Sequence, residues 1–169
     1  MIKTRKITLL AIIISQALIQ HYIEGFIPVL DPGAKLGLAN IMTMVTLVIF
    51  GFKEAMVVVV IRSVLGSLLG GSITGILYSL SGGILSGLAM SLLYLNFQSY
   101  FSLMGISTAG AVFHNIGQLL TASWIFGTIG ILYTYLPILM LAAVITGYFN
   151  GLVTRYILKY LHNKLEIKQ

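Results

Sequence analysis

Cysteine is absent from the sequence, and acidic residues are scarce, with four in 169 residues. The lack of cysteine excludes disulfides, thiolate metal sites and a cysteine nucleophile. Charged residues make up 8% of the chain, whereas a soluble domain usually has about 25%. No phosphate-binding P-loop motif occurs, so any ATP-driven step requires a partner protein. These absences exclude most classes of soluble enzyme.

Apolar residues are abundant instead, at 58% of the chain, with a mean hydropathy of +1.01. This composition predicts an integral membrane protein, and the length allows about six crossing helices of about 20 residues each. We expect one domain, residues 1–169, that forms a compact all-α bundle of six transmembrane helices, with the first apolar segment retained rather than cleaved. The helices are expected near residues 7–23, 36–52, 54–69, 72–95, 106–133 and 136–161, with the three prolines between them or at their starts.

The basic residues are distributed unevenly, which predicts the orientation in the membrane. Eight of the ten flank the first helix, the second connection or the last helix: Lys3, Arg5, Lys6, Lys53, Arg155, Lys159, Lys164 and Lys168. With six crossings, these eight share one side, Lys35 lies on the other side, and Arg62 lies within the membrane. We therefore expect a multi-pass protein of a bacterial cytoplasmic membrane, with both termini in the cytoplasm. The positive charge indicates contact with anionic lipid and not with nucleic acid.

Small residues recur at helical spacing, which allows helix backbones to approach closely. The stripes comprise Gly75, Ser79, Gly83, Gly87 and Ser91 in the fourth span, Ser63, Ser67 and Gly71 in the third, and Ala143, Gly147 and Gly151 in the sixth. Packing within the bundle is the simpler interpretation, and docking of another membrane protein is the alternative. Ala11 and Ser15 form one further small pair, on the first helix.

Arg62 is the clearest candidate for a functional residue inside the membrane. A charge at the bilayer centre costs about 3 kcal/mol, so such residues usually face a partner or a cavity. Arg62 lies about 13 Å along its helix from the cytoplasmic start, at 1.5 Å per residue. Snorkelling to the surface is the alternative, and that depth disfavours it.

The fifth span carries His114 and Gln118 one turn apart, with Asn115 beside them. Three hydrogen-bonding side chains on one face predict the wall of a substrate site, although a lone buried histidine is usually structural. Neither a metal site nor a cofactor is expected, because no second histidine stands at ligand spacing from His114.

The stretch PGAKLGLAN, residues 32–40, combines a turn with the start of the second helix. Unpaired N–H groups there, together with Lys35, favour an anion, and Asn40 is expected to face the same cavity as Arg62. A tight turn with a snorkelling lysine is the alternative. Glu24 and Asp31 either are solvated loop charges or neutralise Lys35 or Arg62.

Seven strings then identify a family resemblance between about Pro28 and Leu152: GAKLGLANI, FGFKEA, IRSVLGSLLGG, SLSGG, GAVFHNIGQLL, YLPILML and ITGYFNGL. Their order resembles the Gx transporter family, also labelled heptaprenyl diphosphate synthase component I. The resemblance implies a protein similar to the substrate-binding S components of energy-coupling factor transporters. Such components dock on a transmembrane coupling subunit driven by two ATPases. Ala11 and Ser15 correspond to their alanine-x-x-x-alanine docking pattern, with serine in the second position.

Two functions from different classes are therefore expected. The leading one is a non-enzymatic substrate-binding component for uptake of a small, anionic or vitamin-like molecule, with Lys35, Asn40, Arg62, His114, Asn115 and Gln118 as site residues. The alternative is a non-catalytic membrane subunit that assists a soluble prenyltransferase in isoprenoid or quinone synthesis. A single aspartate, Asp31, excludes the catalytic prenyltransferase itself, which needs aspartate-rich Mg²⁺ sites. The hypothesis of an enzyme that uses His114 as a general base has the least support, because no carboxylate or nucleophile is spaced to work with it.

Overall fold

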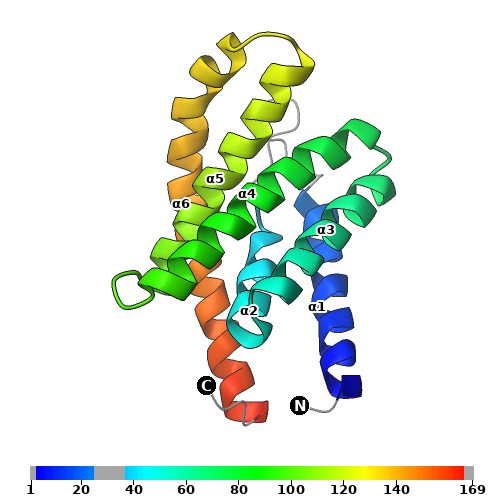
Figure 1. Ribbon diagram of the computed structural model, residues 1–169, viewed down its shortest axis with the longest axis vertical. Helices are drawn as coiled ribbons and strands as arrows, with labels where there is room; N and C mark the ends of the chain where they lie inside the picture. The colour runs from blue at the N-terminus through cyan, green and yellow to red at the C-terminus, as the bar shows by residue number, and fades with distance from the viewer. Residues whose placement is uncertain (1–2, 25–36, 166–169) are drawn as a thin grey trace.

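The structure is a computed structural model that describes residues 3–24 and 37–165. Within these ranges it contains six helices and no strand: α1 (Lys3–Glu24), α2 (Asn40–Phe50), α3 (Phe52–Leu69), α4 (Ile73–Phe97), α5 (Leu103–Ile125) and α6 (Gly130–Leu165). The helices alternate in direction, and the two ends of the chain lie at the same end of the bundle, as Figure 1 shows. The predicted all-α bundle of six helices is therefore confirmed.

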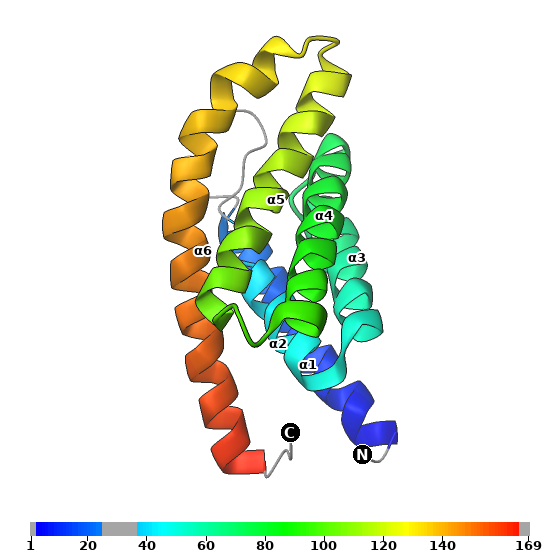
Figure 2. The ribbon, with the colours of Figure 1, turned by 60° about the vertical axis from the view of Figure 1, so that its left-hand side comes forward.

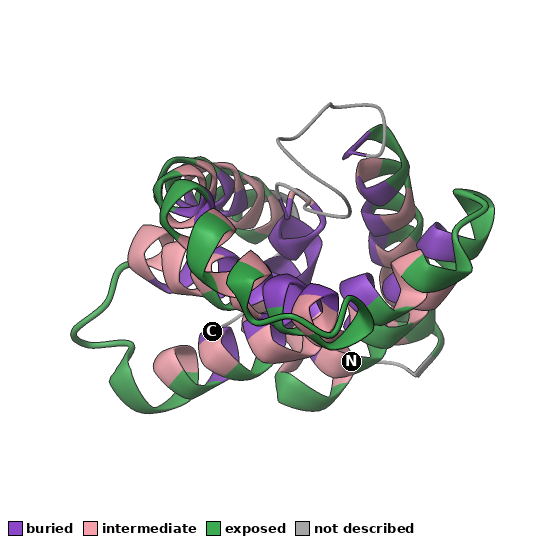
Figure 3. Cartoon of the chain, turned by 90° about the horizontal axis from the view of Figure 1, so that it is seen from above, coloured by how far each residue is buried: buried purple, intermediate pink, exposed green. Residues whose placement is uncertain are grey.

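The short helix α2 is the centre of the bundle. It contacts each of the other five helices, and most of its residues are buried. Figure 2 shows α6, α5, α4 and α3 side by side in that order, with α1 and α2 behind them. Seen from above in Figure 3, the buried positions gather where the helices face one another. Because α2 is enclosed by protein, its eleven residues do not have to span the bilayer themselves.

Length and composition correct the prediction of six crossing helices. Within the described residues, three helices are long and apolar enough to cross a membrane: Thr4–Glu24, Ile73–Phe97 and Gly130–Asn163. The remaining helices are shorter, as α2 is, or carry polar residues, as α3 and α5 do. The apolar segments support a membrane protein, and the polar faces of α3 and α5 are covered inside the bundle.

The predicted boundary between the last two helices is wrong by several residues. The fifth helix ends at Ile125 rather than near Tyr133, because Gly127 adopts a left-handed conformation with φ 64°. The chain turns there, and α6 begins at Gly130. Pro137 therefore lies inside a helix and not at its start, which corrects the prediction for that proline. The other two prolines lie outside the described residues.

The start of the second helix is also later than predicted. Gly37 has φ +76° and Leu38 and Ala39 form a turn, so regular helix begins at Asn40 and not near Leu36. Serine side chains cap the N-termini of α4 and α5. The Ser72 and Ser102 hydroxyl oxygens accept hydrogen bonds from the backbone N–H groups of Gly75 and Gly105, at 2.9 and 3.2 Å.

An ion pair joins α1 to the start of α3 at the end of the bundle that carries the termini. The Lys6 ammonium donates to the Glu54 carboxylate. The same ammonium lies 5.9 Å from the centre of the Phe50 ring, within the range of a cation–π contact. Glu54 therefore has a structural role at the start of α3, through its ion pair with α1.

The small residues of α6 pack directly on the backbone of α5. A Cβ atom added at Gly147 would lie 2.5 Å from the Cα of Thr108, and one added at Gly151 would lie 2.5 Å from the Cα of Met104. Such distances are too short for any side chain, and neither neighbour is a flexible side-chain end. The interpretation of this stripe as packing within the bundle is confirmed.

We predict that Gly147→Ala destabilises the protein by about 1–3 kcal/mol, because the added methyl group forces α5 and α6 apart. The measurement is thermal unfolding of the purified protein in detergent. Gly105→Ala is the matched control, because a Cβ there meets its nearest neighbour, the Phe101 ring, at an ordinary 3.6 Å. Equal melting temperatures for the two variants would contradict the close approach of α5 and α6.

Candidate functional site

Arg62 lies in the interior of α3 with 1% of its surface exposed. Its Nη2 atom donates a hydrogen bond to Oδ1 of Asn40 on α2, at 2.8 Å. On the side of α4, Gly83 leaves room for the guanidinium, since a Cβ there would lie 3.4 Å from Nη2. The arginine therefore does not snorkel, and three helices enclose its charge.

Glu24, at the end of α1, supplies a negative charge to this region. Its side chain is 3% exposed, and its carboxylate interacts electrostatically with the Arg62 guanidinium. The same carboxylate accepts hydrogen bonds from the backbone N–H groups of Gly37 and Leu38, the latter at 3.1 Å. The interpretation of Glu24 as a solvated loop charge is wrong, because its side chain is buried. Its negative charge acts on Arg62 without a direct ion pair between them, so its role in neutralising Arg62 stays a prediction. Asp31 lies outside the described residues.

Gly37 links three helices, α1, α2 and α6, through its backbone. Its N–H group bonds to Glu24, and its carbonyl accepts from the backbone N–H of Asn40 at 2.9 Å and from Nδ2 of Asn150 on α6 at 3.1 Å. A Cβ at this position would lie 2.9 Å from Nδ2 of Asn40 and 3.9 Å from the His114 ring of α5. Glycine is required here both for the positive φ and for this lack of space.

His114 and Gln118 on α5 are each 3% exposed and both face α4. A Cβ added at Gly82 would lie 3.0 Å from Cε1 of His114 and 3.0 Å from Cγ of Gln118. The predicted pairing of these two residues on one face is therefore observed. Asn115 turns to the other side, where its Nδ2 atom donates to the Leu139 carbonyl of α6 at 2.9 Å.

Together these groups form what we call the polar cluster: Glu24, Asn40, Arg62, His114, Gln118 and Asn150. Every helix except α4 contributes a side chain, and α4 contributes the space beside Gly82 and Gly83. The site residues Asn40, Arg62, His114 and Gln118 are thus brought together, whereas Asn115 binds α6. Lys35 lies outside the described residues.

Three atoms of the polar cluster are buried without a hydrogen-bond partner among the described residues. They are Nε of Arg62, Nδ2 of Asn40 and Oδ1 of Asn150. An unpaired buried polar group costs about 1–3 kcal/mol, so proteins rarely leave several in one place. Two of the three are donors beside a positive charge, an arrangement suited to the oxygen atoms of an anion.

Asn150 was not predicted as a site residue, although a signal was available. It is a fully buried amide in a helix that is long and apolar enough to cross a membrane, and polar residues in such helices usually face the bundle interior. Within the described residues, no group of three or more histidine, aspartate or glutamate side chains is arranged to hold a metal ion. The two donors of Arg62 and Asn40 that are unpaired among the described residues make the polar cluster a candidate site for an organic or inorganic anion.

Ala11 and Ser15 lie on the outer face of α1. Both are exposed, and the Ser15 hydroxyl donates to the Ala11 carbonyl at 2.9 Å. The opposite face of α1 carries the buried Ile13, Ala17 and His21, with the His21 ring packed against Gly66 of α3. The small pair does not take part in packing within the bundle.

Comparison with known proteins places the chain in one family. A family model described as heptaprenyl diphosphate synthase component I matches residues 13–157, which include the whole polar cluster. No curated protein and no solved structure matched the chain. The word component in the family description denotes one part of a synthase rather than a complete enzyme. With most of its length matched, the chain belongs to the heptaprenyl diphosphate synthase component I family.

Proposed function

We propose that the chain is the membrane-embedded, substrate-binding component of an uptake system for a small anionic or vitamin-like molecule. The polar cluster is its binding site, and Arg62 is the main contact for the anion. No catalytic step is assigned to the chain. Lys35, two positions before Gly37, remains in the proposed site as a prediction, and Asn115 positions α5 against α6.

One observation carries this proposal: a buried arginine with unpaired hydrogen-bonding atoms around it, where the helices converge. Glu24 balances the charge of Arg62 while bonding to the chain at Gly37 and Leu38. The guanidinium Nε and the Asn40 amide remain to donate hydrogen bonds. A structural ion pair alone would not need these additional buried polar groups, because each one costs free energy when unpaired.

The proposed arrangement in the membrane has both termini in the cytoplasm, with α1, α4 and α6 as the helices that are long and apolar enough to cross. The supporting feature is that Lys6 and Lys53 lie near the starts of α1 and α3, and Arg155 and Lys159 lie in the last third of α6. The start of α1 and the end of α6 lie at the end of the bundle that carries both termini (Figure 1). The polar residues of α3 and α5 face the interior, and their 18 and 23 residues extend about 27 and 35 Å. The end of α1 and the start of α2, which contribute Glu24 and Asn40 to the polar cluster, then face the outside.

The experiment that tests the function is mass spectrometry of small molecules that co-purify with the protein. The wild type is expected to retain one anionic molecule at close to one equivalent. A Lys53→Ala control, changed at an exposed charge far from the cluster, should retain the same amount. If no anionic molecule is retained, and none from a panel of vitamins and carboxylates binds by calorimetry, the proposal is wrong.

The exposed pair on α1 is the proposed docking surface for a transmembrane coupling subunit driven by two ATPases. We predict that Ala11→Leu with Ser15→Leu lowers uptake and capture of the partner about tenfold or more, because bulky residues prevent close helix approach. Ligand retention and melting temperature should stay at wild-type values, since neither residue packs inside the bundle. Unchanged uptake and partner capture in the double variant would show that this face of α1 is not the docking surface.

The family description favours a second candidate: a non-catalytic membrane subunit of heptaprenyl diphosphate synthase. Its partner would be a soluble prenyltransferase subunit rather than ATPases. Co-expression with the soluble prenyltransferase of the same genome distinguishes the two. A stable complex with altered product chain length supports the accessory role, whereas a complex with a coupling subunit and two ATPases supports uptake.

A further inference from the structure

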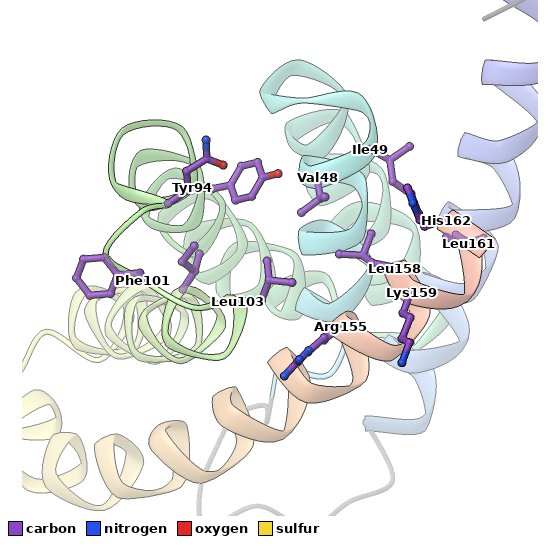
Figure 4. A pocket seen from close by; sticks show the side chains of 12 residues that line it. Val48, Ile49, Tyr94, Phe101, Leu103, Arg155, Leu158, Lys159, Leu161 and His162 are labelled. Carbon is purple, nitrogen blue, oxygen red and sulfur yellow. The ribbon is translucent and has the colours of Figure 1, made fainter. Parts of the chain in front are cut away.

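A second candidate site lies at the end of the bundle that carries the termini, away from the polar cluster. A cavity of about 550 Å³ opens there between α2, the turn from α4 to α5, and α6. Figure 4 shows Tyr94 and Leu103 on one side of it, Val48 of α2 above, and Arg155 and Lys159 projecting from α6. The cavity thus combines an apolar wall with two cations.

Among the residues that the structure describes, no carboxylate pairs with either of the two cations. Within the described residues, the only ion pair joins Lys6 and Glu54, and none of the residues that line the cavity is acidic. Arg155 and Lys159 are one helical turn apart, where like charges repel. The dipole of α6 does not explain them, because its effect is confined to the last turn and both residues lie before it.

Aromatic side chains place this level of the bundle at the surface of the membrane. Tyr100, Tyr156 and Tyr160 are 82%, 68% and 64% exposed, next to the cavity in sequence. Tyrosine gathers where the hydrocarbon of a bilayer meets the headgroups, because its ring is apolar and its hydroxyl is polar. The two cations therefore lie at the depth of lipid phosphates, and the apolar wall extends towards the acyl chains.

We propose that this cavity binds one anionic phospholipid. Its phosphate lies between Arg155 and Lys159, and the upper part of one acyl chain packs against Leu103 and Val48. The guanidinium suits a phosphate because its N–H groups match two oxygen atoms at once. The volume falls in the range of sites for small organic molecules, about 300–1,000 Å³, so it holds a headgroup and part of a chain while the rest remains in the bilayer. Basic pockets between membrane helices are known to bind such headgroups.

Native mass spectrometry of the full chain in detergent, titrated with phosphatidylglycerol, tests the proposal. The wild type should bind one molecule more tightly than phosphatidylcholine with the same acyl chains. Arg155→Gln with Lys159→Gln should weaken phosphatidylglycerol binding about 30-fold, since each cation near an anionic headgroup contributes about 1 kcal/mol. Lys53→Gln, an exposed cation at the same end but outside the cavity, should bind like the wild type.

A second variant distinguishes lipid binding inside the cavity from nonspecific electrostatic attraction of lipid to the two cations. Leu103→Trp leaves both cations intact and fills the apolar part, so it should also weaken phosphatidylglycerol binding about tenfold or more. Gel filtration and melting temperature confirm that each variant is folded. Equal binding of the two lipids, or undiminished binding by the double variant, overturns the proposal. Displacement of phosphatidylglycerol by lower concentrations of inorganic phosphate or farnesyl diphosphate overturns it in favour of a soluble phosphate ligand.

Discussion

Arg62→Ala is expected to lower affinity for the co-purifying anion about 100-fold, which corresponds to about 2.7 kcal/mol. The guanidinium is the only basic side chain of the polar cluster that is charged at every physiological pH. Its removal takes away the charge and the Nε donor, and it leaves Asn40 without its 2.8 Å partner. The loss falls within the range of about 2–5 kcal/mol for truncating one partner of a buried charge pair.

The measurement is the amount of anion retained per mole of protein by mass spectrometry, followed by calorimetry once the anion is identified. Arg62→Lys is the informative companion, because lysine keeps the charge but cannot offer two parallel N–H groups. It should bind more weakly than the wild type and more tightly than Arg62→Ala. Wild-type retention in a folded Arg62→Ala variant would sink the binding-site model while leaving the fold unaffected.

Removal of Arg62 also leaves the Glu24 carboxylate buried without its counter-charge, so lost binding has to be separated from lost folding. Arg62→Ala combined with Glu24→Gln keeps the region neutral. This double variant should elute as a folded protein and still fail to retain the anion. If it regains the anion, the arginine serves the fold and the ligand is held elsewhere.

The class of protein and the number of helices were predictable from composition and apolar segments alone. Helix boundaries were less predictable, and the last two helices illustrate the reason. The predicted connection near residues 134–135 relied on Pro137 as a helix start. In the structure, α6 continues through Pro137 because its long contact with α5 compensates for one lost backbone hydrogen bond. The turn occurs instead at Gly127, where positive φ is easy.

The polar cluster was predictable in part for a physical reason. Polar side chains in membrane helices avoid lipid, so Arg62, His114 and Gln118 had to face the interior. What no periodicity shows is the tertiary pairing through Gly37, which joins the end of α1 to α6. The roles of Glu24 and Asn150 depend on that backbone contact, and Asn115 differs from its neighbours because the Leu139 carbonyl lies opposite it.

Glu24→Ala is expected to destabilise the protein by about 3–5 kcal/mol, because it leaves the buried charge of Arg62 uncompensated and two backbone N–H groups without an acceptor. The change leaves the Arg62 guanidinium without its negative partner and the N–H groups of Gly37 and Leu38 without their acceptor. Chemical unfolding in detergent, followed by the loss of helical signal, measures the effect. Glu24→Gln retains an acceptor oxygen and should cost less than Glu24→Ala.

A double-mutant cycle identifies how much of that cost is the charge pair. In an Arg62→Met background no buried cation remains, so Glu24→Gln should change the free energy of unfolding by at least about 2 kcal/mol less than it does in the wild type. Additive effects would mean that Glu24 acts only through Gly37 and Leu38, as an acceptor for the turn before α2. Strong coupling would mean that one carboxylate both fixes this turn and balances the arginine. In that case the loss of either residue affects stability and binding together, because the chain has no other described acid near Arg62 to take its place.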